Sequence, residues 1–130
     1  MATPVALPTL STREAVADAL YRCVLGIDNN DRALFESACL KDESMLVVAG
    51  PFKIEGWTAI NDFFARLFDL ITTHITSNIR VELKDNADTA YMTCHALSYH
   101  VKPDDALKPE DTSYTASSLY FIDLVKDSSD

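Results

Sequence analysis

Residues 91–99 read YMTCHALSY, with one histidine inside a run that otherwise has the composition of a buried β-strand. Side chains of an extended backbone alternate between two faces. The even face is small and mostly apolar. The odd face carries hydroxyls and an imidazole, from Tyr91, Thr93, His95, Leu97 and Tyr99. We therefore expect the odd face to line a closed pocket in which His95 transfers protons.

The strand expected here extends over residues 89–101. We expect one further long strand before it in the sequence and one after it. After Thr73 the apolar residues recur at every second position, beginning at Ile75. Residues 114–125 are apolar on both faces, so this strand requires cover on both sides. Helices can cover one face, and a second subunit is the simplest cover for the other. We predict a homo-oligomer, a dimer or trimer, formed through the outer sheet face.

The N-terminal half reads as helical up to an acidic corner. Ser11 and Glu14 have the spacing of a capping box, which begins a helix. Apolar residues at helical spacing carry this helix to about Asp28. Asp31 can cap a second, shorter helix. We expect residues 1–10 to be a flexible segment and residues 11–130 to form a single domain.

A small hairpin and a third helix complete this half. Residues 45–55 contain two short strand-like runs joined at Gly50. Gly56 ends the hairpin, and apolar residues at helical spacing then predict a helix over residues 57–71. The expected fold class is therefore α+β, in which a curved antiparallel sheet wraps around three helices from the N-terminal half of the chain.

Charge and cysteine content narrow the function classes. Twenty acidic against eleven basic residues give a net charge of −9, which disfavours nucleic acid and anionic membrane surfaces as partners. The three cysteines are widely spaced among apolar residues, as is typical of reduced core thiols. Residues 1–8 lack the basic and apolar pattern of a signal peptide. We expect a soluble, cytoplasmic protein.

Three segments resemble the SnoaL-like branch of the nuclear-transport-factor-2-like superfamily. They are residues 26–35, 50–56 and 73–78, within a resemblance that covers about residues 12–126. The sequence is similar to scytalone dehydratase and to fungal SnoaL-like cyclases and isomerases that act on polyketides. The resemblance implies a cone-shaped fold, no cofactor, and a small hydrophobic substrate.

The dehydratase pattern implies a catalytic set. In it an aspartate at the end of the first helix pairs with a histidine in a central strand, which matches Asp28 and His95, and a second histidine opens the preceding strand, which matches His74. The pattern's two tyrosines are unmatched, since Ile27 stands in one position, and Ser118 replaces an asparagine. The alternative for His95 is a core histidine bonded to a backbone carbonyl, and for Asp28 a helix-end turn residue.

The two other histidines are constrained by strand geometry. In an uninterrupted strand His74 shares a face with Asn78 and Arg80, so it reaches the pocket only if a bulge resets the register. His100 lies five residues after His95, hence on the other face, which makes a two-histidine metal site from this strand improbable. We predict no metal.

Further candidates would bind the substrate. Tyr99, Ser118 and Tyr91 could donate hydroxyl hydrogen bonds, and an apolar wall is expected from Trp57, Phe64 and Phe68. Overall we predict a cofactor-independent lyase or isomerase that uses a His-Asp pair for isomerisation, cyclisation or dehydration of a small polycyclic or aromatic metabolite. The alternatives are a non-catalytic ligand- or protein-binding module and a hydrolase, which would require Arg80 and Glu82 to face inward.

Overall fold

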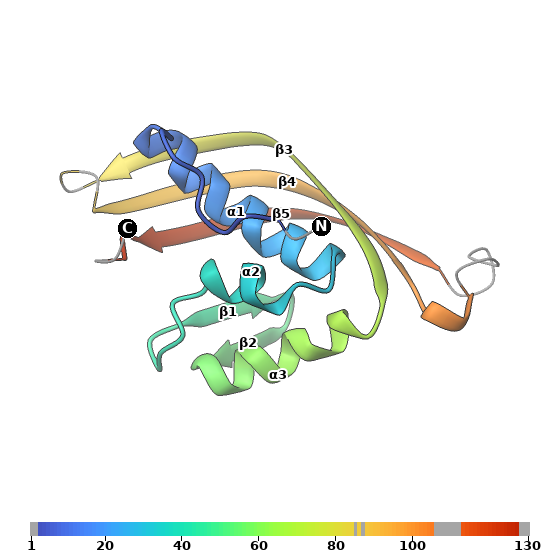
Figure 1. Ribbon diagram of the computed structural model, residues 1–130. Coiled ribbons are helices and arrows are strands. Elements are labelled where there is room, and N and C mark those ends of the chain that lie inside the picture. The colour runs from blue at the N-terminus through green and yellow to red at the C-terminus, as the bar shows by residue number, and fades with distance from the viewer. Residues whose placement is uncertain (1–2, 85, 87, 106–112, 128–130) are drawn as a thin grey trace.

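The chain folds into helices that lie against one face of a long antiparallel sheet (Figure 1). The structure is a computed structural model that describes residues 3–84, 86, 88–105 and 113–127. Its helices and strands, in chain order, are α1 (Thr12–Asp28), α2 (Arg32–Ser37), β1 (Leu46–Ala49), β2 (Phe52–Glu55), α3 (Trp57–Phe68), β3 (Ile71–Lys84), β4 (Thr89–Val101), the short 3-10 helix η2 (Pro103–Asp105) and β5 (Tyr114–Val125). The predicted α+β class and the order of elements are confirmed.

The helix starts follow from the caps expected from the sequence. Ser11 accepts a hydrogen bond from the Glu14 backbone N–H at 3.2 Å, and the Glu14 carboxylate accepts from the Ser11 N–H at 2.9 Å. The Asp31 side chain caps α2 by accepting a hydrogen bond from the Leu34 N–H at 3.1 Å. The predicted end of the third helix is wrong, because α3 ends at Phe68 and Ile71 already pairs in β3.

Three long strands form one sheet in the order β3-β4-β5. Neighbouring strands run antiparallel over nearly their whole length, from Ile71 opposite Val101 to Lys84 opposite Thr89. The sheet curves around the helices, with α1 lying across it and the β1-β2 hairpin beside α2 and α3 (Figure 1). Within the described ranges, no helix is long and apolar enough to cross a membrane.

A β-bulge divides β3 into two halves of opposite side-chain phase. Ser77 pairs with His95 and Arg80 pairs with Thr93, so Asn78 and Ile79 together oppose a single residue of β4. Asn78 has a φ of 56°, in the left-handed region that asparagine tolerates. Even-numbered side chains therefore point toward the helices before the bulge, and odd-numbered ones do so after it.

The core shows which face of β4 meets the helices. Leu20 and Val24 of α1 pack against Met92 and Cys94, and all four are buried. The even positions of β4 therefore point inward, and the expectation that the odd positions line the pocket is wrong. Both faces of this strand carry apolar side chains, so alternation alone could not distinguish the inner face from the outer one.

The end of α1 is held against α2 by a close backbone approach. A Cβ added at Gly26 would lie 2.4 Å from the Phe35 nitrogen, which leaves no space for a larger residue. The Gly26 carbonyl also accepts a hydrogen bond from the Asp31 N–H at 2.7 Å. This contact fixes the turn at the end of α1, where Asp28 lies.

Candidate functional site

Asp28 is bound to the start of β3 by three hydrogen bonds. One carboxylate oxygen, Oδ1, accepts from Thr72 Oγ1 at 2.8 Å and lies 2.7 Å from His74 Nδ1. The other, Oδ2, accepts from the His74 backbone N–H at 2.8 Å. The side chains of His74 and Asp28 are only 6% and 15% exposed. A carboxylate with three donors is held in a single orientation.

This arrangement defines the tautomer of His74. Nδ1 faces a carboxylate oxygen, so it carries the proton and donates it to Asp28. Nε2 is then the nitrogen that remains available to accept a proton from another molecule. If it does so, the resulting imidazolium lies in direct contact with an anionic partner. The pair has the geometry of a general acid/base unit.

His100 lies beside this pair on the same face of the sheet. Its ring centroid is 5.8 Å from that of His74, and its other side stacks on Tyr114 at 4.4 Å with the planes 3° apart. Nε2 lies 2.8 Å from Ser98 Oγ, whereas the buried Nδ1 has no hydrogen-bond partner among the residues that the structure describes. Burial, together with the nearby His74, lowers the pKa of His100. A buried ring nitrogen without a partner is the atom that a bound molecule would satisfy.

Strand pairing brings the two histidines together. His74 pairs with Ser98 and Thr72 pairs with His100, so His74 and His100 are diagonal neighbours on the inner face. The bulge that His74 was expected to need in order to face the site occurs at Asn78, four residues beyond His74. The sequence reasoning missed His100 because it assigned the inner face to the odd positions. A signal was available in the small residues of the even face, Cys94, Ala96 and Ser98, which leave room for helices to pack closely.

His95 is not part of this site. It is exposed on the outer face, and its Nδ1 lies 3.0 Å from the Asn78 side-chain nitrogen. The predicted pairing of Asp28 with His95 is therefore wrong, since Asp28 pairs with His74 instead. The cause is the reversed phase of β4, which directs every odd side chain away from the helices.

The same reversal removes most of the predicted substrate-binding hydroxyls. Tyr99 lies on the outer face, as does Tyr91, whose ring is 5.4 Å from Lys84 Nζ. Ser118 pairs with Ala96 on the inward-pointing phase of β5 but is exposed. The charged pair required for a hydrolase is exposed on the outer face after the bulge, which contradicts that alternative.

The three aromatic residues predicted to form an apolar wall pack around Phe35, a buried residue of α2. Phe35 is fully buried, with ring centroids 5.2 Å from Phe64, 5.4 Å from Phe68 and 6.4 Å from Trp57. The Arg32 guanidinium covers Phe68 at 4.4 Å. These contacts give the three residues a packing role, and their role in substrate binding stays a prediction.

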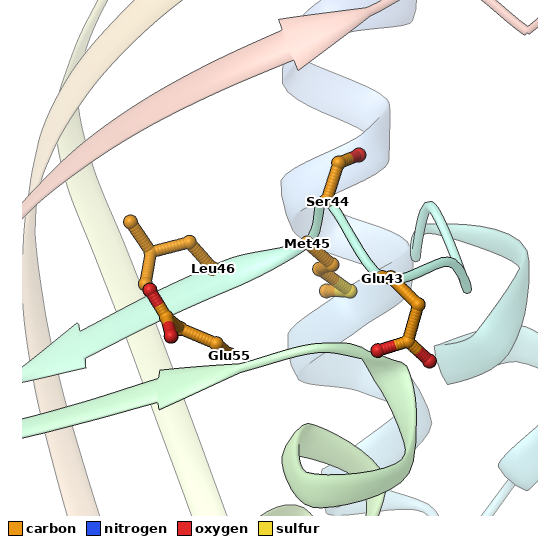
Figure 2. A pocket seen from close by; sticks show the side chains of 5 residues that line it. All are labelled: Glu43, Ser44, Met45, Leu46 and Glu55. Atoms are coloured by element: carbon orange, nitrogen blue, oxygen red, sulfur yellow. The ribbon is translucent and has the colours of Figure 1, made fainter.

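A surface pocket of about 560 Å³ lies elsewhere, at the β1-β2 hairpin. Figure 2 shows Glu43 on the loop before β1 and Glu55 at the end of β2, with Ser44, Met45 and Leu46 between them. None of these five residues belongs to the predicted site. In the described part of the chain, no group of three or more histidine, cysteine or acidic residues could hold a metal ion.

Solved structures share this architecture. A putative scytalone dehydratase from Novosphingobium aromaticivorans aligns with a TM-score of 0.73 at 18% identity, over 89% of this chain and 74% of that chain. A hexachlorocyclohexane dehydrochlorinase aligns with a TM-score of 0.70 at 16% identity, over 90% and 76%. Together with the helices and the long antiparallel strands, these define the class as an α+β protein of the nuclear-transport-factor-2-like fold.

The family follows from sequence comparison. The model of the SnoaL-like domain matches residues 8–130, and the chain belongs to this family. The terrestric acid biosynthesis cluster protein E of Penicillium crustosum is 39% identical over 131 aligned positions, which cover 99% of this chain and 82% of that protein. The predicted resemblance is thereby confirmed. Relatives of this chain thus include a fungal secondary-metabolite cluster protein.

Proposed function

We propose that this protein is a cofactor-independent lyase or isomerase in which His74, oriented by Asp28, transfers a proton on a small cyclic metabolite. The single observation that carries the proposal is the buried hydrogen bond of 2.7 Å between His74 Nδ1 and Asp28 Oδ1. The pair of His74 and Asp28 replaces the predicted pair of His95 and Asp28, and the proposed proton transfer by a histidine that an aspartate orients is unchanged.

In the proposed reaction, His74 Nε2 removes a proton from a carbon next to a carbonyl group. Asp28 stabilises the imidazolium that forms, and His74 then returns the proton. Return to a second carbon gives isomerisation, and return to a departing hydroxyl group gives dehydration. The enolate oxygen formed in between lies against His100, whose unpartnered Nδ1 donates a hydrogen bond to it.

Burial of the site supports a substrate that is mainly apolar. The buried His74 and His100 rings and the stacked Tyr114 ring offer little charge besides that of Asp28. The name of the Penicillium crustosum relative places that protein in the biosynthesis of a fungal acid. We therefore propose a polyketide-like substrate, aromatic or polycyclic, from secondary metabolism.

The test is exchange of the carbon-bound protons next to the carbonyl of a hydroxylated tetralone in D₂O, followed by ¹H NMR. Exchange reports proton removal whatever the later outcome of the reaction. We expect the protein to accelerate it, and His74→Gln to reduce the acceleration by about 10²- to 10⁴-fold. His95→Gln is the matched control and should exchange at the wild-type rate.

The competing function is a ligand-binding module of the same fold, which the same samples distinguish. Tetralone-induced shifts of the His74 and His100 imidazole signals without any exchange above buffer would favour binding alone. Equal loss of exchange in His74→Gln and His95→Gln would contradict the assignment of the site to the inner face.

A further inference from the structure

Ser98 is a buried serine beside the two histidines of the inner face. It lies on β4 directly opposite His74 and two residues before His100, so its side chain points to the same side as both. Ser98 is 8% exposed and His100 is 5% exposed. The Ser98 Oγ lies 2.8 Å from His100 Nε2, and among the described residues this is its one hydrogen-bond contact. Each of the two side chains therefore depends on the other for a hydrogen bond.

The number of buried groups left without a partner decides which nitrogen of His100 carries the hydrogen. If Nδ1 carries it, the Ser98 hydroxyl donates to Nε2, and within the described chain the Nδ1 N–H alone is unpaired. If Nε2 carries it, that N–H donates to Ser98 Oγ, which leaves both the hydroxyl hydrogen and the Nδ1 lone pair unpaired. Each unpaired buried polar group is destabilising. The tautomer with the hydrogen on Nδ1 is therefore favoured.

The surroundings of His100 keep its ring neutral and in a fixed position. Burial and the nearby His74 lower the pKa of His100, so at about pH 7.5 the ring is neutral and carries one ring hydrogen. Tyr114 stacks on the ring with the planes 3° apart, and the His74 ring lies at 79° to it. Rotation by half a turn would keep the stack but lose the bond to Ser98. The serine hydroxyl thus also decides on which side Nδ1 lies.

We infer that Ser98 is a positioning residue, which fixes His100 as a hydrogen-bond donor through Nδ1 and adapts the site to a ligand with a carbonyl or enolate oxygen. The free nitrogen of His74 has the opposite character, because its Nδ1 donates to Asp28 and its Nε2 carries a lone pair. The two rings therefore present one base and one donor to the same molecule. The catalytic consequence rests on the function proposed above, whereas the tautomer of His100 does not depend on it.

The first test reads the tautomer directly, by long-range ¹H–¹⁵N correlation NMR of the free protein at about pH 7.5. Protonated and unprotonated ring nitrogens differ in ¹⁵N shift, and His100→Gln assigns the signals. We expect the Nδ1–H form in the wild type and in Ser98→Thr, which keeps the hydroxyl, and a shift toward the Nε2–H form in Ser98→Ala. A wild-type His100 in the Nε2–H form, or an unchanged tautomer in Ser98→Ala, would overturn the inference.

The second test measures tetralone proton exchange over a range of tetralone concentrations. Ser98→Ala should lower kcat by about tenfold to a hundredfold and leave KM nearly unchanged, because the donor acts on the enolate more than on the ketone. Ser98→Thr should restore most of kcat. The matched control is Ser117→Ala, which removes an exposed hydroxyl on β5 opposite Leu97 and should behave as the wild type. Wild-type kcat in Ser98→Ala, or equal losses in Ser98→Ala and Ser117→Ala, would contradict the role of Ser98.

The two tests separate an error in the role of Ser98 from an error in the proposed function. If the wild type gives no exchange above buffer while His100 shows the Ser98-dependent Nδ1–H form, the proton transfer is wrong and the positioning of His100 stands. If His74→Gln abolishes exchange and Ser98→Ala leaves it unchanged, the proposed function stands and the role of Ser98 is wrong. Thermal melts monitored by circular dichroism check that each variant is folded, and the wild-type tautomer requires no variant.

Discussion

The inner and outer faces of β4 differ in what their histidines do. On the inner face His100 is buried, stacked on Tyr114 and close to His74, and one of its ring nitrogens has no partner in the described part of the chain. On the outer face His95 is exposed and contacts the side chain of Asn78. Five positions apart in one strand, the two imidazoles face a protein interior and an open surface. The helices that cover a strand, rather than the composition of its faces, decide where a titratable group can act.

The largest effect is expected from removing the anchor of the inner site. Asp28→Asn keeps the volume but removes the charge that stabilises a protonated His74, so tetralone proton exchange should fall by about 10²- to 10⁴-fold. Asp123→Asn on the outer face is the matched control and should leave the exchange rate unchanged. Similar losses in both variants would remove the distinction between the two faces.

Shortening a buried side chain on the inner face of the sheet should cost more unfolding free energy than shortening an exposed one on the outer face. Met92 is fully buried against α1, so Met92→Ala should lower the free energy of unfolding by about 2–5 kcal/mol. Leu119→Ala, at a side chain that is 59% exposed, should change it by less than about 0.5 kcal/mol. Urea denaturation at matched pH measures both changes in the free energy of unfolding. Equal costs would contradict the assignment of the faces.

The close approach between α1 and α2 should tolerate no added methyl group. Gly26→Ala forces a shift of the Phe35 backbone, so we expect a loss of about 1–3 kcal/mol in the free energy of unfolding. Gly50→Ala provides a contrast, since Gly50 has open space around its Cα but a φ of 59°, so its cost is conformational and not steric. Because Gly26 lies two residues before Asp28, only Gly26→Ala should also reduce proton exchange.

The smallest effect is a pH dependence of stability that the buried His100 should produce. Burial lowers the pKa of His100 in the folded state below its ordinary value of about 6.5. The unfolded chain therefore takes up the proton first as the pH falls. The contribution of neutral His100 to stability is complete above about pH 6.5 and is lost as the pH drops through its folded-state pKa.

Urea denaturation at pH 7.5 and 5.5 measures this loss. His100→Gln should reduce the difference in unfolding free energy between the two pH values, whereas His95→Gln should leave it as in the wild type. An unchanged difference in His100→Gln would show that His100 is not the group responsible.

Much of the fold was predictable because its signals are local. The capping box at Ser11, the cap at Asp31 and the bounds 89–101 and 114–125 for the last two strands all agree with the structure. The end of α3 was not predictable, because Ile71 fits both the helical spacing of the preceding residues and the strand that it begins. Local periodicity cannot decide between two elements that meet at one residue.

The site was predicted less well because it depends on which side of the sheet the helices cover. Asp28 and His74 were both identified, and the bulge that His74 requires is present at Asn78. The residue pattern favours His95 over His100, because the odd face of β4 carries the hydroxyl groups that suit a pocket. Only the packing of Leu20 and Val24 on Met92 and Cys94 shows that the even face of β4 meets the helices. Contacts between residues about 70 positions apart leave no local trace in the sequence.

The bulge at Asn78 makes the site depend on chain length as well as on residue identity. Deletion of one residue at this position would retain every residue of the candidate site in the sequence. It would nevertheless turn the side chains of one half of β3 to the opposite face of the sheet relative to the other half. His74 and the core residues Ile79 and Val81 could then no longer point to the same side. When relatives are aligned, a single gap in this column would therefore mark a change in the architecture of the candidate site, even where the aspartate and the histidines are all retained.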